Sequence, residues 1–407
     1  MIENIDKMNG WSIEELPNLV FFQEGPGVRN NQYTDSGVKL LNVANLKDGN
    51  VYLDNTDRYI SEEEAYGKYS HFLVDEGDLI IASSGIKVEY FDKKMGFAKK
   101  EHLPLCMNTS TIRFKTLDDN ILDIEYFAYF LKTNYFKKQI SRLITGSAQL
   151  NFGPSHLKQI KVILPPIETQ KKIVEVLDKA QELIDKRKEQ IDALDELVKS
   201  RFVEMFGDVI TNDKKYPVEK LEDITSLITD GTHQTPTYSD SGYIFLSSKN
   251  VTSGKINWDD IKYIPEELHI ELNRRLEPRF NDILLAKNGT TGVAALVDRD
   301  CVFDIYVSLA LIRLKSNINP IFMLHMINSS GCKFQFNNSL KGIGVPNLHL
   351  SAIRKTKVIL PPIELQNEFA DFVKQVDKLK SQMQTSLKEL EDNFNSLMQK
   401  AFKGELF

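Results

Sequence analysis

Few residue patterns in this sequence of 407 residues could support catalysis or hold a metal. The glycine-rich stretch at residues 289–292 lacks the G-x-x-x-x-G-K-S/T spacing that places backbone N–H groups and a lysine around phosphates, so a turn is the better interpretation. Seven histidines form no H-E-x-x-H motif. Cys106, Cys301 and Cys332 lack the paired spacing of a zinc site, which predicts reduced and mostly buried thiols.

Motifs, net charge and hydropathy also limit the classes of function that are expected of the chain. Both Pro-Pro pairs follow leucine, so the Asn-Pro-Pro-aromatic motif of amino-methyltransferases is absent. The net charge of −6 is not that of a basic nucleic-acid-binding domain, so any DNA binding would need local basic surface or a partner's charge. There is no signal-peptide pattern and no apolar run of about 18 residues, so a cytoplasmic protein is expected.

An internal repeat organises the chain. The octamer Lys-Val-Ile-Leu-Pro-Pro-Ile-Glu occupies residues 161–168 and returns at residues 357–364, which is 196 positions later. One variable residue and a glutamine, Gln170 or Gln366, follow each copy. Repetition of this kind predicts two copies of one structural unit.

Further blocks of the two copies match in the same order. They are residues 11–16 with 216–221, 33–37 with 238–242, 77–85 with 281–289, 112–115 with 312–315, and Asn151 with Asn347. The offset drifts from 205 to 196, as insertions and deletions in loops would cause. Apolar runs after turn residues predict strands at 39–44, 78–82, 243–246 and 282–286, and residues 124–131 and 320–327 are predicted helices. Each unit is therefore a mixed α/β domain of about 150 residues.

A long helix is predicted after each Pro-Pro pair, because proline marks a helix entrance. Apolar residues alternate at spacings of four and three, as in a coiled-coil seam. The first seam is Ile173, Leu177, Ala180, Ile184, Ile191, Leu194 and Val198; the second is Phe369, Val373, Val376, Met383, Leu387, Leu390, Phe394 and Leu397. Arg187 and Lys380 interrupt the seams, either fixing the register or packing their stems with the charge in water.

The two helices most simply pair with each other, although each could instead pack on its own domain or on another subunit. Residues 171–201 at ~1.5 Å per residue give a helix about 46 Å long.

The duplicated unit, the repeated Leu-Pro-Pro-Ile-Glu-x-Gln block, the heptad helices and the final Gly404-Glu405-Leu406 resemble the DNA-specificity subunit of a type I restriction-modification system. The resemblance covers essentially the whole chain. It implies an α+β fold: two repeated mixed α/β target recognition domains, residues 1–166 and 207–362, separated and joined by two long antiparallel coiled-coil helices, residues 167–206 and 363–407.

The resemblance also implies a function without catalysis. Each recognition domain would read one half of a split site in double-stranded DNA, and the helices would set the spacing and dock two methylation subunits. A spacer of about 46 Å corresponds to roughly 13 base pairs. Restriction and translocase subunits would join through that methyltransferase core. No cofactor is expected on this chain; S-adenosylmethionine, ATP and Mg belong to partner subunits.

Polar loop residues are the candidates for DNA contact, because Arg and Lys recognise guanine, Asn and Gln recognise adenine, and Ser or Thr recognise either. In the first unit they are Arg29, Asn30, Asn31, Gln32, Tyr33, Asn42, Asn45, Ser83, Ser84 and Lys87. In the second unit they are His233, Gln234, Thr235, Ser248, Lys249, Asn250, Lys287, Asn288, Thr290 and Thr291. Loops are generally polar, so a solvated turn is the alternative for any one of them.

Two other functions fit parts of the pattern. A coiled-coil scaffold whose variable domains bind protein would suit the acidic net charge, but two divergent loop sets on one framework favour the reading of two targets. A specificity module that serves a methyltransferase without a restriction subunit has the same sequence features.

Overall fold

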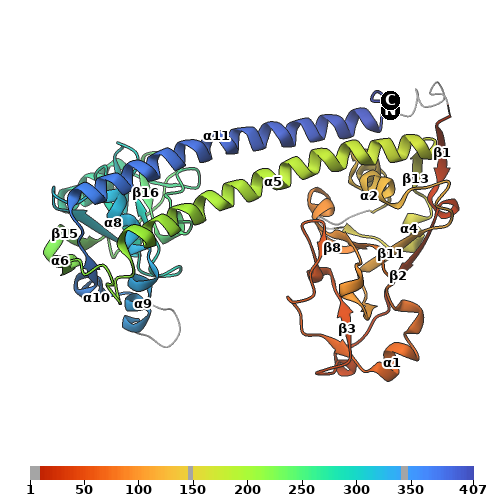
Figure 1. The fold of residues 1–407 in the computed structure, drawn as a ribbon, viewed down its shortest axis with the longest axis horizontal. Helices are drawn as coiled ribbons and strands as arrows, with labels where there is room; N and C mark the ends of the chain where they lie inside the picture. The colour runs from red at the N-terminus through yellow and green to blue at the C-terminus, as the bar shows by residue number, and fades with distance from the viewer. Residues whose placement is uncertain (1–9, 145–149, 341–346) are drawn as a thin grey trace. The chain divides into compact units, whose positions relative to one another are not determined.

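The computed structural model describes residues 10–144, 150–340 and 347–407. The chain forms two compact units: unit 1 comprises Met1–Arg187 with Ser386–Phe407, and unit 2 comprises Lys188–Thr385. Each unit holds one copy of the repeat together with part of each long helix (Figure 1). The predicted duplicated α+β architecture is confirmed.

A four-stranded antiparallel sheet is the centre of each unit. In unit 1 the strand order is β2 (Val20–Glu24), β11 (Thr111–Thr116), β7 (Leu79–Ala82) and β9 (Met95–Phe97). In unit 2 it is β15 (Thr225–Asp230), β21 (Leu309–Leu314), β18 (Ile283–Ala286) and β19 (Ala294–Leu296). All four residues of β7 and of β18 are buried, as their unbroken apolar runs predict.

A smaller three-stranded sheet accompanies the first. Its order is β10 (Leu105–Met107), β3 (Val38–Leu41) and β6 (Tyr59–Ile60) in unit 1, and β20 (Phe303–Ile305), β16 (Tyr243–Leu246) and β17 (Lys262–Ile264) in unit 2. In both units the central strand pairs in parallel with β10 or β20. The strand predicted at residues 243–246 is thus confirmed over its full length, and the one predicted at 39–44 is confirmed in its first part, residues 39–41.

The repeated octamer forms a strand that closes each unit onto its own beginning. β13 (Lys161–Leu164) pairs antiparallel with β1 (Ser12–Glu15), and β22 (Lys357–Ile359) pairs antiparallel with β14 (Val218–Lys220). The opening and closing blocks of each repeat are therefore partners in space. This pairing gives a physical reason for the recurrence of both blocks.

The repeated glutamine fastens each long helix to its domain. Gln170 is fully buried; its Oε1 accepts a hydrogen bond from Asp123 N at 2.9 Å, and its Nε2 donates to Pro165 O at 2.8 Å. Gln366 repeats this arrangement with Asn319 N at 3.0 Å and with Pro361 O at 2.8 Å. Such buried backbone groups need a partner, and the glutamine supplies it.

Short helices complete the domains. Those of unit 1 are α1 (Glu62–Tyr66), α2 (Ile124–Lys132), α3 (Asn134–Leu143) and α4 (Pro154–Leu157); those of unit 2 are α6 (Leu221–Ile224), α7 (Glu266–Arg275), α8 (Pro320–Ile327), α9 (Ser330–Ser339) and α10 (Leu350–Lys355). Unit 1 also has the two-stranded pairs β4 (Leu46–Lys47) with β5 (Asn50–Val51) and β8 (Ser84–Ile86) with β12 (Leu150–Asn151). The helices predicted at 124–131 and 320–327 are confirmed.

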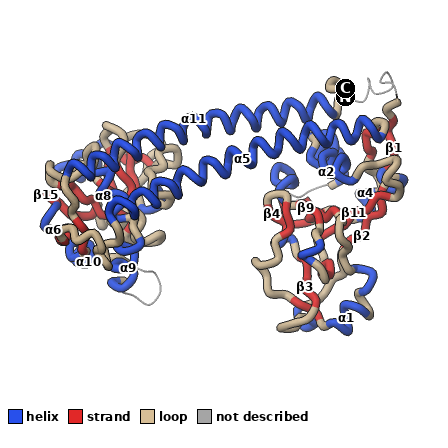
Figure 2. Tube along the Cα trace, in the orientation of Figure 1, coloured by secondary structure: helices blue, strands red, loops and turns tan. Residues whose placement is uncertain are grey.

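The two long helices, α5 (Ile167–Phe206) and α11 (Ile363–Ala401), are unbroken in Figure 2. In unit 1 the beginning of α5 shares a core with the end of α11, through Ile173 and Met398. In unit 2 the end of α5 shares a core with the beginning of α11, through Phe202 and Phe369, whose ring centroids lie 5.4 Å apart. Both contacts require antiparallel pairing. All fifteen seam residues are buried or half-buried.

None of the helices within the described residues is long and apolar enough to cross a membrane.

Candidate nucleic-acid interface

In unit 2, three of the predicted loops meet at the segment that follows β20. Lys287 N donates a hydrogen bond to Ser308 O at 2.8 Å, and Ser248 N donates to Ser308 Oγ at 3.0 Å. Val307 N donates to Thr232 O at 2.9 Å. The loops after β15, β16 and β18 therefore form one surface. Sequence reasoning missed Ser308, because nothing in its neighbourhood marks it as a junction.

A buried ion pair holds two of these loops together. Lys287 Nζ lies 2.6 Å from Asp230 Oδ2, and both residues are buried. Burial acts to raise the pKa of Asp230, but the hydrogen bond and charge of Lys287, helped by His233, outweigh it and lower the pKa. Arg275 Nη2 also donates to Asp230 O at 2.6 Å. Asp230 is thus a charged anchor between the loops.

In unit 1 an asparagine serves as the corresponding junction. Asn108, which follows β10, is 3% exposed. Its Oδ1 accepts hydrogen bonds from Val28 N at 3.2 Å and from Thr109 N at 2.8 Å, while its Nδ2 donates to Asn42 Oδ1 at 3.0 Å. The loop after β2 and the loop after β3 are thereby joined. Asn108 was also missed, although it follows a buried strand directly.

A glycine permits the close approach at this edge in both units. A Cβ on Gly25 would lie 2.1 Å from Asn108 O, and one on Gly231 would lie 1.9 Å from Ile305 O. No side chain fits at such distances. The two glycines end β2 and β15 in the same way, which places the following loops, with Arg29 and with His233, at equivalent positions of the two units.

The predicted contact residues fall into three groups by exposure. Exposed are Arg29, Asn30, Asn31, Lys87, His233, Gln234, Thr235, Lys249 and Thr290; half-buried are Gln32, Tyr33, Asn42, Ser84, Ser248, Asn288 and Thr291; buried are Asn45, Ser83, Asn250 and Lys287. Direct DNA contact stays a prediction for the first two groups. The buried side chains are covered by protein, and Asn45, Asn250 and Lys287 make polar contacts within their own domain.

Asn45 and Asn250 show what such buried residues do. Asn45 Oδ1 accepts from Asn42 N at 2.8 Å, and its Nδ2 donates to Tyr52 O at 2.8 Å. Asn250 Oδ1 likewise accepts from Ser247 N at 2.9 Å, and its Nδ2 donates to Asp260 O at 2.8 Å. Asparagine was read as an adenine contact, but at these two positions it closes a short turn in each repeat.

A pair of asparagines in unit 2 carries unused hydrogen-bonding capacity. Asn288 and Asn347 face each other in an antiparallel β-bridge, and the Oδ1 atom of each is buried without a hydrogen-bond partner. Ser84 and Asn151 pair at the matching place in unit 1. Unpaired buried polar atoms are uncommon, and each needs an explanation such as an ordered water, an ion or a functional role. Asn347 was not among the predicted contacts, although its match with Asn151 was visible in the sequence.

The fold and this loop surface define a duplicated recognition protein: two copies of one domain, each presenting a polar edge of its own composition. A family model described as the type I restriction modification DNA specificity domain matches the chain twice, over residues 10–196 and 213–392. The chain belongs to this family of DNA specificity proteins. Its relatives there are named as specificity subunits of type I restriction enzymes.

Relatives match along nearly the full length. The type I restriction enzyme EcoKI specificity subunit of Escherichia coli (strain K12) is 23% identical, over 98% of this chain and 89% of that protein. The MjaVIII specificity subunit of Methanocaldococcus jannaschii is 22% identical, over 93% and 90%. A solved structure titled as the basis of complex assembly and conformational transition of the type I R-M system shares the fold, with a TM-score of 0.57 and 14% identity over 98% and 99% of the chains.

Proposed function

We propose that each recognition domain of this specificity subunit reads one half of a bipartite DNA site, and that the two halves differ in sequence. The observation that carries the proposal is the pair of equivalent loop edges with unlike side chains. Unit 1 exposes Arg29, Asn30 and Asn31 after the turn at Gly25, and unit 2 exposes His233 and Gln234 at the matching place. Unlike donors and acceptors select unlike bases.

We further propose that the paired helices act as spacer and docking surface. Two recognition domains related by pseudo-twofold symmetry suit two half-sites that lie a fixed distance apart on a duplex. Four apolar residues of the helices, Leu183, Leu197, Val203 and Leu379, are between 42% and 59% exposed. They would supply apolar contacts to a protein docked on these otherwise charged helices. Two methylation subunits are the proposed partners; S-adenosylmethionine would belong to them, and ATP and Mg to a restriction subunit.

Selection from a random duplex library tests the proposal. The full-length protein, purified with its methylation subunits, would be incubated with random 40-base-pair DNA, and bound molecules would be sequenced. Enrichment of two dissimilar half-sites around a fixed non-specific gap is the expected result. Stable complexes that enrich no DNA sequence would instead favour the scaffold function, in which the variable domains bind protein.

A further inference from the structure

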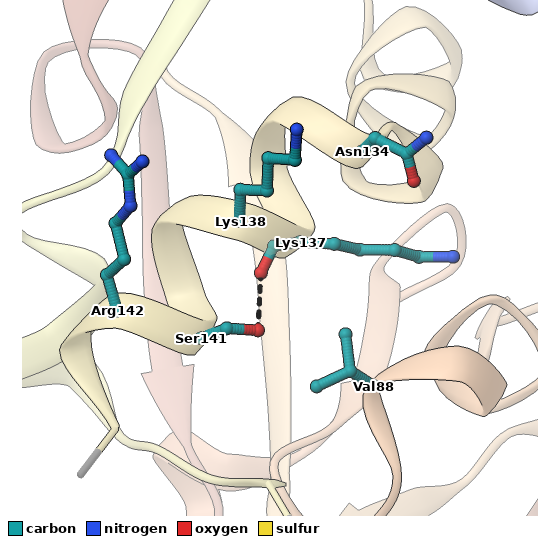
Figure 3. A pocket seen from close by; sticks show the side chains of 6 residues that line it. All are labelled: Val88, Asn134, Lys137, Lys138, Ser141 and Arg142. Atoms are coloured by element: carbon teal, nitrogen blue, oxygen red, sulfur yellow. Dashed lines mark hydrogen bonds between the residues drawn. The ribbon is translucent and has the colours of Figure 1, made fainter.

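Unit 1 has a basic groove, and none of the residues that line it is among the predicted DNA contacts. It lies between α3 and the short 3-10 helix Val88–Lys93, and its cavity measures about 450 Å³. Val88, Asn134, Lys137, Lys138, Ser141 and Arg142 line it (Figure 3). Three of these six side chains are cations, so the groove is suited to an anionic ligand.

The walls of the groove are fixed by packing beneath it. Phe91 of the 3-10 helix lies 5.4 Å from Phe136 of α3 between ring centroids, and 6.2 Å from Phe152. Lys137 forms an ion pair with Asp92, which joins the two walls and neutralises the carboxylate. The shape of the groove therefore depends on Phe91 and Lys137, and its remaining charge belongs to other residues.

Lys138 and Arg142, the two other cations of the groove, differ from Lys137 in their contacts. Within the described part of the chain, neither Lys138 nor Arg142 forms an ion pair or a side-chain hydrogen bond, and both are exposed. They are four residues apart, which places them on one face of α3. Figure 3 shows both side chains extending from the same side of that helix, while Lys137 extends in another direction. Ser141 Oγ donates to Lys137 O at 2.7 Å, so its proton is already used.

The fold does not require these charges. Helix α9 of unit 2 occupies the matching place in the repeat, and it carries Phe334 and Asn338 where α3 carries Lys138 and Arg142. An uncharged pair is therefore compatible with the same domain. A structural role for the two cations of α3 is thereby disfavoured, and a ligand-binding role is favoured.

The groove lies next to the loop edge of unit 1, which is the part of the domain that carries the predicted contacts Arg29, Asn42 and Ser84. Strand β8 carries the predicted contact Ser84 and runs directly into Lys87 and Val88, the first lining residue. The partner of β8 is β12, the next described element after α3. A duplex held against the loop edge would thus continue past an exposed lysine, Lys87, towards the two unpaired cations.

We propose that this groove binds the phosphodiester backbone of double-stranded DNA beside the half-site of the first recognition domain. Lys138 and Arg142 are the phosphate contacts. The inference rests on the proposed function, and it assigns these residues to affinity and register instead of base choice, since phosphate contacts carry no sequence information. Unit 2, with Phe334 and Asn338, lacks the contact, so the two domains hold their half-sites with unequal strength.

The salt dependence of DNA binding tests the proposal. Full-length protein carrying Lys138→Gln and Arg142→Gln would be titrated by fluorescence anisotropy with a 30-base-pair duplex of random sequence, between 50 and 300 mM NaCl. Each phosphate contact contributes about 0.9 to the slope of log K against log salt, so the double variant is expected to lose about 1.8, and up to about 60-fold in affinity at 0.1 M salt. Each single variant is expected to lose about half of that slope.

A matched control removes two lysines at the opposite end of the sheet. Lys99 and Lys100 are exposed, and they adjoin the beginning of β7, whereas the loop edge adjoins its end. Lys99→Gln with Lys100→Gln is expected to leave the slope unchanged. An unchanged slope in the Lys138 and Arg142 variants, or an equal loss in the control, would overturn the groove proposal alone. Failure of the wild-type protein to bind duplex DNA would overturn the proposed function with it.

Discussion

Lys380 of α11 and Asp195 of α5 form an ion pair within unit 2, with the lysine Nζ 2.5 Å from both carboxylate oxygens. The lysine side chain is 16% exposed and that of the aspartate is 54% exposed. The positive charge of Lys380, on the otherwise apolar seam of α11, is therefore paired with a carboxylate of the facing helix α5. Asp195, which lies beside the apolar seam of α5, is thus a partner in helix pairing.

Replacement of Lys380 by leucine is expected to stabilise unit 2. An ion pair with a half-exposed partner contributes roughly 0–1 kcal/mol, and a leucine on the seam contributes apolar contact in its place. The melting temperature should rise by about 2–4 °C, the change that ~1 kcal/mol causes in a domain of this size. Asp195→Asn, which removes the ion pair but adds no apolar contact, is the control, with a loss of about 1 kcal/mol at most. A fall of several degrees in Lys380→Leu would show that the ion pair dominates.

Replacement of the buried glutamine by alanine should weaken the attachment of the long helix to its domain. Gln170→Ala leaves Asp123 N and two carbonyl groups without their partner, at a cost of roughly 2–4 kcal/mol in the free energy of unfolding. Gln366→Ala should have a similar effect in unit 2. Glu168→Ala, two residues away and exposed, is expected to change stability by less than about 0.5 kcal/mol. Urea denaturation followed by circular dichroism measures all three, and equal midpoints would contradict the anchoring role.

The stability of unit 2 should depend on pH through His325. Burial lowers the pKa of His325 from 6.5 to about 4; the charge of Asp377 opposes this and that of Lys255 adds to it. The unfolded chain takes up the proton first, so this contribution is present above about pH 6.5 and is lost as the pH falls towards 4.

Between pH 6.5 and 5 the free energy of unfolding should fall by about 1–2 kcal/mol. His325→Phe keeps a ring beside Phe369, whose centroid lies 5.2 Å from that of the histidine, and should flatten this part of the pH profile. Thermal melts of both proteins at pH 5.0, 5.75 and 6.5 provide the comparison. An unaltered profile in the variant would exclude His325 as the source.

Breaking the ion pair between Lys287 and Asp230 should disable the second recognition domain selectively. Lys287→Met leaves a buried carboxylate without its partner, at a cost of about 3–5 kcal/mol, whereas the additional change Asp230→Asn should recover much of it. The folded pKa of Asp230 lies below its ordinary 3.8, so the pair contributes fully above that pH and is lost only in stronger acid. Half-site selection by the single and double variants checks the loop role; loss of the first half-site would contradict it.

The sequence predicts the large elements well because the repeat and the heptads are strong periodic signals. The strand register is a different case. Residues 112–115 and 312–315 match in sequence, yet Ile112 lies opposite Ile81, whereas Ile312 lies opposite Ile283, the counterpart of Leu79. The strands differ by two residues in register. Because side chains alternate with a period of two, such a shift keeps the same face buried and leaves no trace in the hydrophobic pattern.

The candidate site was predicted at the level of loops and not of single residues. Lys287 stands in a polar loop, and its partner Asp230 is 57 positions away, so no local pattern shows that the lysine is buried. Asn45 and Asn250 are of a residue type that can contact adenine, but their side chains are buried within the domain. Asn108 and Ser308, which join the loops, are defined only by contacts between distant segments. Polarity locates the surface, and tertiary contacts decide which side chains reach it.

Insertion of two heptads, about four helical turns, after Lys188 in α5, with the matching insertion in α11, should lengthen the gap between half-sites and leave both half-sites unchanged. The heptad period keeps the seam in register, so the recognition domains are not altered. Motif mapping of the longer protein measures the gap. Altered half-sites with an unaltered gap would refute this division of labour.

The most direct test of the central claim is a genome-wide methylation map. The chain would be co-expressed with its methylation subunit in a host that lacks DNA methylation, and modified bases would be located by single-molecule sequencing. The account predicts one split motif, with two dissimilar half-sites around a fixed non-specific gap. A single continuous motif, or no methylation despite a stable complex, would contradict the claim that two recognition domains each read half of the site.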